Sequence, residues 1–205
     1  FTFSWVHRFW PTVRYGWAGH WVHHSSERFN FSTALRQTPM VSFNGVMLMA
    51  LLPPAFIGFP LQYAVVALEL NLFFQFFIHT ETIRRMPGWF EWLFNTPSHH
   101  RVHHGSNPGQ LDTNFAGVFM LWDRCFGTFV DERDAGDIRY GVDHRPAMTL
   151  NPVRLVFAEF ISMLSDVRRY GDFRIIYKHP SWVEQHYGKQ QTVPGQSSMP
   201  LSRSQ

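Results

Sequence analysis

The sequence predicts an all-helical protein with helices embedded in a membrane and a histidine-rich metal site. Two adjacent apolar runs, residues 41–59 and 61–78, are each close to the ~20 residues that a helix needs to cross a bilayer. The spacing His-x-x-His-His occurs twice in a chain with one cysteine. Aromatic residues make up 17% of the chain, which favours a protein that faces or binds lipid.

Composition limits the alternatives. The 205 residues suffice for one domain with its own core. Cys125 is alone, which excludes an intramolecular disulfide and a cysteine-based zinc site. The positive charge comes almost entirely from dispersed arginine, without a basic run or a nucleic-acid motif, so we expect a membrane surface and no nucleic acid as partner. The chain begins inside an apolar, helix-like stretch without Met, so we expect a fragment whose missing start carries further membrane helices.

The two apolar runs predict a membrane hairpin at about 41–78. Pro53 and Pro54 interrupt the first run, and Pro60 separates it from the second, so we expect two short helices joined near Pro60. The alternative is a buried core hairpin of a soluble protein. Glu69 is the one charged residue of the second run, and its cost in lipid predicts that it faces the interior of the bundle. A cationic and aromatic flank typical of a membrane interface follows: Arg84, Arg85 and Trp89.

The other elements are predicted from local signals. Residues 29–34 form a loop that leads to a helix cap, and the segment 118–129 predicts a helix that ends at Gly127. Residues 131–150 are polar and loop-like, and the Gln/Ser/Pro-rich tail 188–205 is expected to be disordered. Asn151-Pro152 begins an amphipathic helix through about Arg169, with these residues on one side: Val153, Val156, Phe157, Phe160 and Leu164.

Each His-x-x-His-His places three imidazoles on one face of a helix. The first copy is His20, His23 and His24, and the second is His100, His103 and His104. Residues at i, i+3 and i+4 are neighbours on a helix, and clustered imidazoles repel one another when protonated, so we interpret them as neutral metal ligands. Two copies predict two sets of nitrogen ligands that converge on one site.

Three further histidines lie in the first half of the chain: His7, His79 and His99. Such a set exceeds the four ligands of a single zinc ion, so two metals sharing it is the simplest interpretation. An all-nitrogen site suits iron, copper or zinc, and oxidation of a lipid C–H bond favours iron, because zinc is redox-silent. The alternative is that the histidines are structural or bind zinc passively. Three histidines outside the clusters are interpreted as ordinary surface residues: His144, His179 and His186.

Longer motifs surround these histidines. They are Trp17-Ala18-Gly19-His20, His23-His24-Ser25-Ser26-Glu27, Thr33-Ala34-Leu35-Arg36-Gln37, His79-Thr80-Glu81, the run Asn95 to Gly105, Trp122-Asp123-Arg124 and Phe126-Gly127-Thr128-Phe129. From about His7 to Trp182 the sequence resembles the fatty acid hydroxylase / sterol desaturase superfamily of non-heme di-iron membrane oxygenases. Its likeness is greatest to the alkylglycerol monooxygenase-like and bacterial sterol desaturase-like branch.

The resemblance implies an integral membrane helical bundle with a cytosolic helical cap that holds a histidine-rich di-metal site on the cytoplasmic side. The domain would cover residues 1–187, with its N-terminal part incomplete. The implied cofactors are two iron ions, with dioxygen as co-substrate. The implied partners are the membrane, a lipid substrate and an external electron donor, and the implied reaction is hydroxylation or desaturation of that lipid.

The resemblance also assigns the ligands. His7 matches the first histidine box of the family, and His79 matches a further histidine of this branch. The second and third boxes are matched by His20, His23 and His24 and by His100, His103 and His104. His99, next to the third box, is a candidate additional ligand. Asn114 and Asp123 match polar positions near the site, where they would orient imidazoles.

One residue departs from the family. The first box is His-x-x-x-His, but Pro11 stands where its second histidine is expected. Proline cannot ligate a metal, so one iron would lose a ligand unless water, His99 or another side chain replaces it. The first alternative function is therefore a degenerate member that binds metal or lipid without turnover, and the second is a zinc-dependent membrane hydrolase. The substrate stays open among sterols, fatty acyl chains, alkylglycerols and carotenoids.

Overall fold

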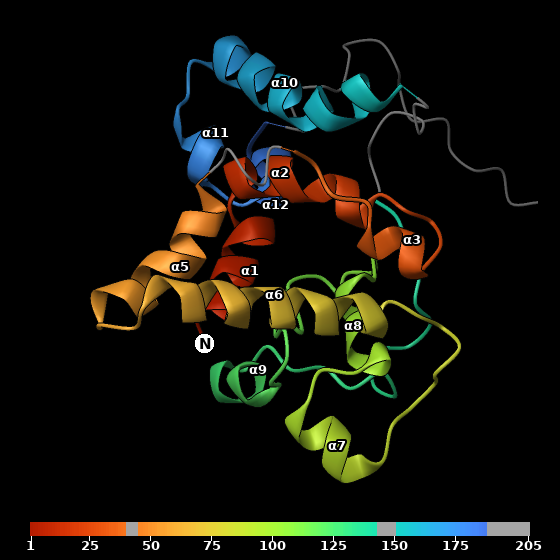
Figure 1. Ribbon diagram of the computed structural model, residues 1–205. Helices are drawn as coiled ribbons and strands as arrows, with labels where there is room; N and C mark the ends of the chain where they lie inside the picture. The colour runs from red at the N-terminus through yellow and green to blue at the C-terminus, as the bar shows by residue number, and fades with distance from the viewer. Residues whose placement is uncertain (40–44, 143–150, 188–205) are drawn as a thin grey trace, which may run out of the picture.

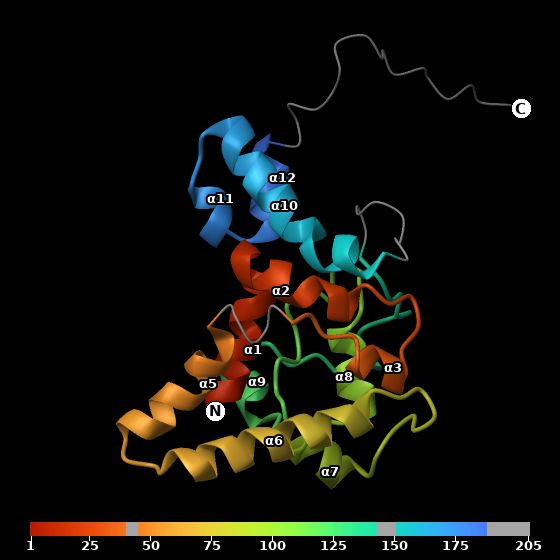
Figure 2. The ribbon, with the colours of Figure 1, turned by 45° about the horizontal axis from the view of Figure 1, so that its top comes forward.

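The structure, a computed structural model, describes residues 1–39, 45–142 and 151–187. Its helices lie in three levels (Figures 1 and 2). One side is formed by α5 (Val46–Phe56) and α6 (Leu61–Ile78), and the middle by α1 (Thr2–Thr12) and α2 (Arg14–His24). The other side is formed by α10 (Pro152–Tyr170), α11 (Arg174–Tyr177) and α12 (Pro180–Tyr187). The described residues contain helices and two isolated β-bridges but no strand, so the predicted all-helical class is confirmed for them.

A single extended residue, Val13, separates α1 from α2 (φ −121°, ψ 126°). Pro11 lies in the last turn of α1, and because proline has no N–H, the carbonyl of His7 receives no helical hydrogen bond from it. The two helices approach closely at Gly16, where an added Cβ would lie 2.9 Å from the Cα of Trp10. Glycine at this position therefore lets α2 bring its histidines up to α1.

The predicted cap after the first histidine motif is confirmed. Asn30 begins the short α3 (Phe31–Ala34) and accepts a hydrogen bond from the Ser32 N–H at 2.9 Å. The Asn30 N–H in turn donates to the Thr33 hydroxyl at 3.2 Å, which completes a capping box. This turn fixes the carbonyl of Thr33 beside the histidine motif of α2.

The predicted hairpin is present over its described residues as α5 and α6. α6 has 18 residues, about 27 Å, and is the one helix in the described ranges that is long and apolar enough to cross a membrane. Only 11% of it is buried, and its exposed side chains include Leu61, Tyr63, Val66, Leu70, Phe73 and Phe77. α5 is shorter than predicted, about 16 Å over its 11 residues. Pro53 and Pro54 lie within its last turn and do not interrupt it.

The expectation that Glu69 faces the interior was wrong, because its side chain is exposed. The inward side of α6 is a regular stripe at alternating spacings of four and three: Ala64, Leu68, Asn71, Gln75 and Ile78. Glu69 comes one residue after Leu68 of this stripe, so its side chain is rotated about 100° around the helix axis from the inward side. The inward polar residues of α6 are Asn71 and Gln75, and Gln75 lies one turn before His79.

Three short helices lie between the hairpin and α10: α7 (Gly88–Leu93), α8 (Pro97–His103) and α9 (Leu121–Phe126). α9 ends at Gly127 in the left-handed region (φ 69°), as predicted. It begins later than predicted, because the backbone before it pairs with the end of α7. The Asn95 N–H donates to the Val118 carbonyl at 2.7 Å, and the Met120 N–H donates to the Leu93 carbonyl at 3.0 Å.

The last helices pack on α2 through buried charges. Arg14 of α2 reaches Glu159 at 3.2 Å and Asp166 at 2.5 Å, both on α10. The buried side of α10 therefore combines the charged Glu159 with apolar residues such as Met163, while part of the predicted apolar side is exposed, including Val153, Phe157 and Leu164. The Asn151 side chain accepts hydrogen bonds from the first turn of α10, so the predicted start is confirmed. The predicted tail 188–205, His144 and residues 143–150 lie outside the described residues.

Two small apolar clusters are formed by the residues that the structure describes. One joins Val6 and Trp10 of α1 to Ala50 of α5. The other joins α10 to α11 and α12 through Met163, Ile175 and Val183. Outside these clusters the buried interior contains the histidines, together with apolar residues such as Val22 and Val102.

Candidate metal centre

Four segments bring their histidines to the middle of the molecule. α1 contributes His7, α2 contributes one His-x-x-His-His motif, the residue after α6 is His79, and α8 with its C-cap contributes the second motif. All eight side chains are at most 8% exposed: His7, His20, His23, His24, His79, His100, His103 and His104. The structure thus brings together all eight histidines that the sequence analysis proposed as ligands.

The eight histidines form three groups whose potential ligand atoms lie within 4.8 Å of one another. The four-histidine group is His23, His79, His100 and His104. The three-histidine group is His7, His20 and His103. The junction group is His24, His103 and His104, and it shares one member with each of the others. Such groups suit two ions in an all-nitrogen environment.

Backbone carbonyls fix the orientation of four of these rings. Each carbonyl accepts from an Nδ1–H: Phe115 O from His7 at 2.9 Å, Thr33 O from His23 at 3.0 Å, Gln75 O from His79 at 2.7 Å and Thr113 O from His103 at 2.9 Å. Since a carbonyl oxygen carries no proton, the proton of each neutral ring is on Nδ1. The Nε2 atoms of these four rings therefore present lone pairs.

These lone pairs converge on one another. The Nε2 atoms of His23 and His79 are 3.2 Å apart, and those of His79 and His100 are 3.0 Å apart. On the other side of the cluster, the Nε2 atom of His20 lies 3.3 Å from that of His7 and 3.1 Å from that of His24. Two nitrogen donors on one ion at 2.0–2.1 Å are themselves about 3.0–3.4 Å apart, so the residues present fit metal ions.

Burial keeps these imidazoles neutral. It lowers the pKa of all eight histidines, and the positive charge that neighbouring imidazoles would carry lowers the pKa of most of them further. For His79 burial lowers the pKa from 6.5 to about 4. Near neutral pH the cluster therefore offers unprotonated nitrogens, which is the form that binds metal.

The remaining predicted site residues lie around the cluster rather than in it. His99 belongs to none of the three groups; its Nδ1 lies 3.4 Å from the Thr96 hydroxyl and its ring packs edge-on against Phe129. Asn114 and Asp123 make hydrogen bonds to backbone groups around the cluster. Asn114 donates to the carbonyls of His99 and Val130.

Asp123 acts on His7 through the loop that carries Phe115. Its carboxylate accepts from the N–H groups of Phe115 at 2.9 Å and Ala116 at 2.8 Å, and from the Thr128 hydroxyl at 2.7 Å. The carbonyl of Phe115 in turn holds the His7 ring. The carboxylate therefore orients an imidazole through one intervening peptide unit.

Sequence reasoning missed the residues that support the rings from other segments. Arg101, buried between two histidines of α8, donates to the carbonyls of Thr80, Ile83 and Arg84 and pairs with Glu132. It thus ties the loop after His79 to α8. Helical spacing could have identified Gln75, four residues before His79, but no local signal points to Phe115 or Thr113.

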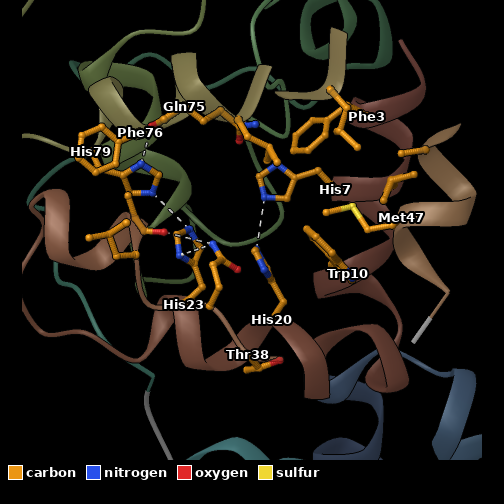
Figure 3. A pocket seen from close by; sticks show the side chains of 17 residues that line it. Phe3, His7, Trp10, His20, His23, Thr38, Met47, Gln75, Phe76 and His79 are labelled. Atoms are coloured by element: carbon orange, nitrogen blue, oxygen red, sulfur yellow. Dashed lines mark hydrogen bonds between the residues drawn. The ribbon is translucent and has the colours of Figure 1, made fainter. Parts of the chain in front are cut away.

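An apolar cavity of about 360 Å³ meets the cluster from the side of α5 and α6. Figure 3 shows His7, His20, His23 and His79 turned toward it. Its other walls are largely apolar and include Phe3, Trp10, Met47, Ala50, Leu72 and Phe76. His23 and His79 belong to the four-histidine group, and His7 and His20 belong to the three-histidine group. The apolar cavity therefore borders both groups.

A second cavity of about 290 Å³ meets the cluster from the side of α12. It is lined by the junction group, by Pro11, and by the polar residues Asp112, His179 and Glu184. His179 was interpreted as an ordinary surface histidine, but its Nε2 pairs with Asp112 at 3.0 Å inside this cavity. His186 is exposed and stacks on Trp182, as expected of a surface residue.

The fold and the site define a class: a helical protein whose buried centre is a set of converging, neutral imidazoles suited to metal ions. Comparison with known proteins identifies the family. The profile described as "Fatty acid hydroxylase" matches residues 1–128. The chain therefore belongs to the fatty acid hydroxylase family, in its alkylglycerol monooxygenase-like branch, and the resemblance seen in the sequence is confirmed.

Three relatives place the chain in that branch. Alkylglycerol monooxygenases of Xenopus tropicalis and Homo sapiens are each 41% identical over 186 residues, which is 89% of this chain and 40% of theirs. The alkylglycerol monooxygenase of Danio rerio is 45% identical over 146 residues, 69% of this chain and 30% of its own. The chain thus spans about 40% or less of the length of these relatives. No solved structure matches it significantly.

Proposed function

We propose that this chain is the metal-binding part of a membrane-bound monooxygenase that uses two iron ions and dioxygen to hydroxylate a lipid. The observation that carries this proposal is the apolar cavity whose polar end is formed by histidines of both metal-binding groups. An apolar chain held in that space would present a C–H bond to both groups at once. The curated relatives carry the name alkylglycerol monooxygenase, so an alkylglycerol is the substrate to test first.

The histidines divide between the ions as their grouping suggests. The four-histidine group would hold one ion, and the three-histidine group, with His24 beside it, would hold the other. Iron held there supplies reduction of dioxygen and oxidation of the C–H bond. The protein's part is to keep the rings in place through the carbonyls of Thr33, Gln75, Thr113 and Phe115, and to exclude water from the cavity with apolar walls.

The membrane proposal rests on α6. Its exposed surface is rich in aliphatic and aromatic side chains, and it ends one residue before His79, at the metal centre. Arg84 and Arg85 follow within one short loop, and cytoplasmic flanks of membrane helices are enriched in such residues. We infer an integral membrane protein with a helical cap and its metal site on the cytoplasmic side. Electrons would come from an external donor.

The first test is the iron content of the full-length protein, purified in detergent and loaded anaerobically. We expect close to two ions per chain, followed by turnover of an alkylglycerol with dioxygen and a reducing donor. Oxygen-18 dioxygen separates the reactions, because hydroxylation transfers labelled oxygen to the lipid and desaturation does not. His186→Gln, outside both cavities, is the matched control.

The result also decides between the alternatives. Zinc at full occupancy with activity that does not depend on iron would favour the hydrolase. Binding of iron without turnover would favour a non-catalytic member in which Pro11 has cost the three-histidine group a ligand. Absence of bound metal would overturn the proposal itself.

A further inference from the structure

The second cavity reaches histidines that the apolar cavity does not. The apolar cavity is bordered by His7, His20, His23 and His79, whereas the second is bordered by the junction group of His24, His103 and His104. The Nε2 atoms of His103 and His104 are buried and have no hydrogen-bond partner. Unpaired buried nitrogens on a cavity wall are costly unless something binds them.

The junction group is connected to both metal-binding groups by shared residues. His103 belongs to the junction group and to the three-histidine group, and His104 belongs to the junction group and to the four-histidine group. An ion held by the junction group could therefore pass to either side by exchanging ligands while one histidine stays bound. Because the imidazoles are neutral, no proton has to leave during such an exchange.

Three polar side chains lie in the exposed part of the second cavity, beside apolar residues such as Leu111 and Pro108. Asp112 and His179 have side-chain exposures of 36% and 33%, and Glu184 is exposed, whereas the junction histidines are at most 8% exposed. The backbone of Asp112 is in the left-handed region (φ 57°), and its carboxylate lies 3.0 Å from the Nε2 of His179. The cavity thus leads from exposed oxygen and nitrogen donors to buried imidazoles.

We propose that the second cavity is the entry route for divalent metal ions, captured by Asp112, His179 and Glu184 and passed through the junction group to the two metal-binding groups. This inference rests on the proposed metal centre. Carboxylates at an opening attract cations and raise the rate of their capture. The apolar cavity is a poor route, because a hydrated cation gains nothing from walls of aliphatic and aromatic side chains.

The test measures the rate of metal uptake rather than turnover. The full-length protein in detergent is stripped of metal and mixed with cobalt(II), and the visible absorption of cobalt bound by histidine is followed in a stopped-flow instrument. The variant combines Asp112→Asn, His179→Gln and Glu184→Gln. Asparagine tolerates the left-handed backbone, so the first substitution preserves the turn. The control is Asp134→Asn with His186→Gln, which removes one exposed carboxylate and one exposed imidazole outside the cavity.

We expect uptake by the entry variant to be about tenfold slower than uptake by the wild type and the control, with the same final cobalt content. Added salt should slow the wild type more than the variant, because it screens the carboxylates. Filling the apolar cavity with an excess of alkylglycerol should leave the rate unchanged.

Three results would overturn the inference while leaving the metal centre intact. Equal uptake rates would show that the three polar residues do not capture the ion. A lower final cobalt content would make them permanent ligands rather than an entry route. Slower uptake in the presence of alkylglycerol would move the entry to the apolar cavity. A wild type that takes up no cobalt would instead overturn the proposed metal centre.

Discussion

The Nε2 atoms of His23 and His79 lie 3.2 Å apart, although each ring donates its Nδ1 proton to a backbone carbonyl. The amide nitrogen of Gln37 also lies 3.3 Å from the His23 Nδ1 and donates to the carbonyl of Ala34 at 3.4 Å. Two facing lone pairs in a buried site repel, so a cation between them would stabilise the contact. That cation would join α2 to the end of α6.

Metal-free protein should lose stability in mildly acidic solution. The pKa of His79 is 6.5 when unfolded and about 4 when folded, because burial disfavours the charged ring. Between these values the unfolded chain binds more protons, so the free energy of unfolding falls as the pH drops from about 6.5 toward 4. Thermal unfolding in detergent across this range measures it. The other buried histidines should add to this loss of stability. A melting temperature that does not change with pH would contradict the prediction.

Metal content should separate the two metal-binding groups. His79 belongs only to the four-histidine group and His7 only to the three-histidine group. His79→Ala and His7→Ala should each reduce the iron content from about two ions per chain to about one, because one group loses a ligand and the other keeps all of its histidines. Elemental analysis of the purified variants beside His186→Ala checks this. Loss of both ions in either variant would indicate a single coupled site.

Two leucines of α6 distinguish the apolar cavity from the exposed surface of this helix. Leu72 lines the cavity, and Leu70 is 63% exposed two residues earlier. Leu72→Trp should reduce kcat/KM for an alkylglycerol by about tenfold or more, since an indole occupies space that the lipid chain needs. Leu70→Trp should have little effect. Steady-state kinetics with equal iron content in both variants is the measurement, and equal activities would place the substrate elsewhere.

The histidine cluster could be predicted from sequence because its information is local. The spacing of His20, His23 and His24 places three rings on one face whatever the rest of the chain does. Helix boundaries with strong signals, such as Gly127 and Asn151, were predictable for the same reason.

What sequence reasoning missed depends on contacts between distant segments. The carbonyl of Phe115 holds His7 from 108 residues away, and any residue type supplies a carbonyl, so no side-chain pattern marks it. The orientation of Glu69 required knowledge of which side of α6 packs inward, and the sequence of α6 has no clear amphipathic pattern that marks this side. The partner of His179 also comes from a different segment, which made that histidine look ordinary.

Asp123 should matter for stability and for one metal-binding group. Its carboxylate receives three hydrogen bonds while 1% exposed. Asp123→Asn would place an amide NH₂ against an N–H donor, which we expect to lower the free energy of unfolding by about 1.5–3 kcal/mol. Because Phe115 would shift, affinity for metal at His7 should also fall. Denaturant titration measures the change in stability and metal titration the change in affinity, with Asp134→Asn as the control. An unchanged metal affinity would show that other contacts hold Phe115.

Pro11 offers the sharpest test of whether the centre is complete. Position 11 is four residues after His7, so a side chain there lies on the same face of α1, and Pro11 already borders the second cavity beside the junction group. Pro11→His should add a nitrogen donor and lower the metal concentration that half-saturates the three-histidine group by about tenfold. Pro11→Ala restores the helical N–H without an imidazole, so it isolates the effect of helix repair. Metal titration of both variants distinguishes the two causes. An equal gain in metal affinity in both variants would assign the improvement to the repaired helix. A gain confined to Pro11→His would mean that the natural chain holds its second ion with one ligand fewer than the family pattern.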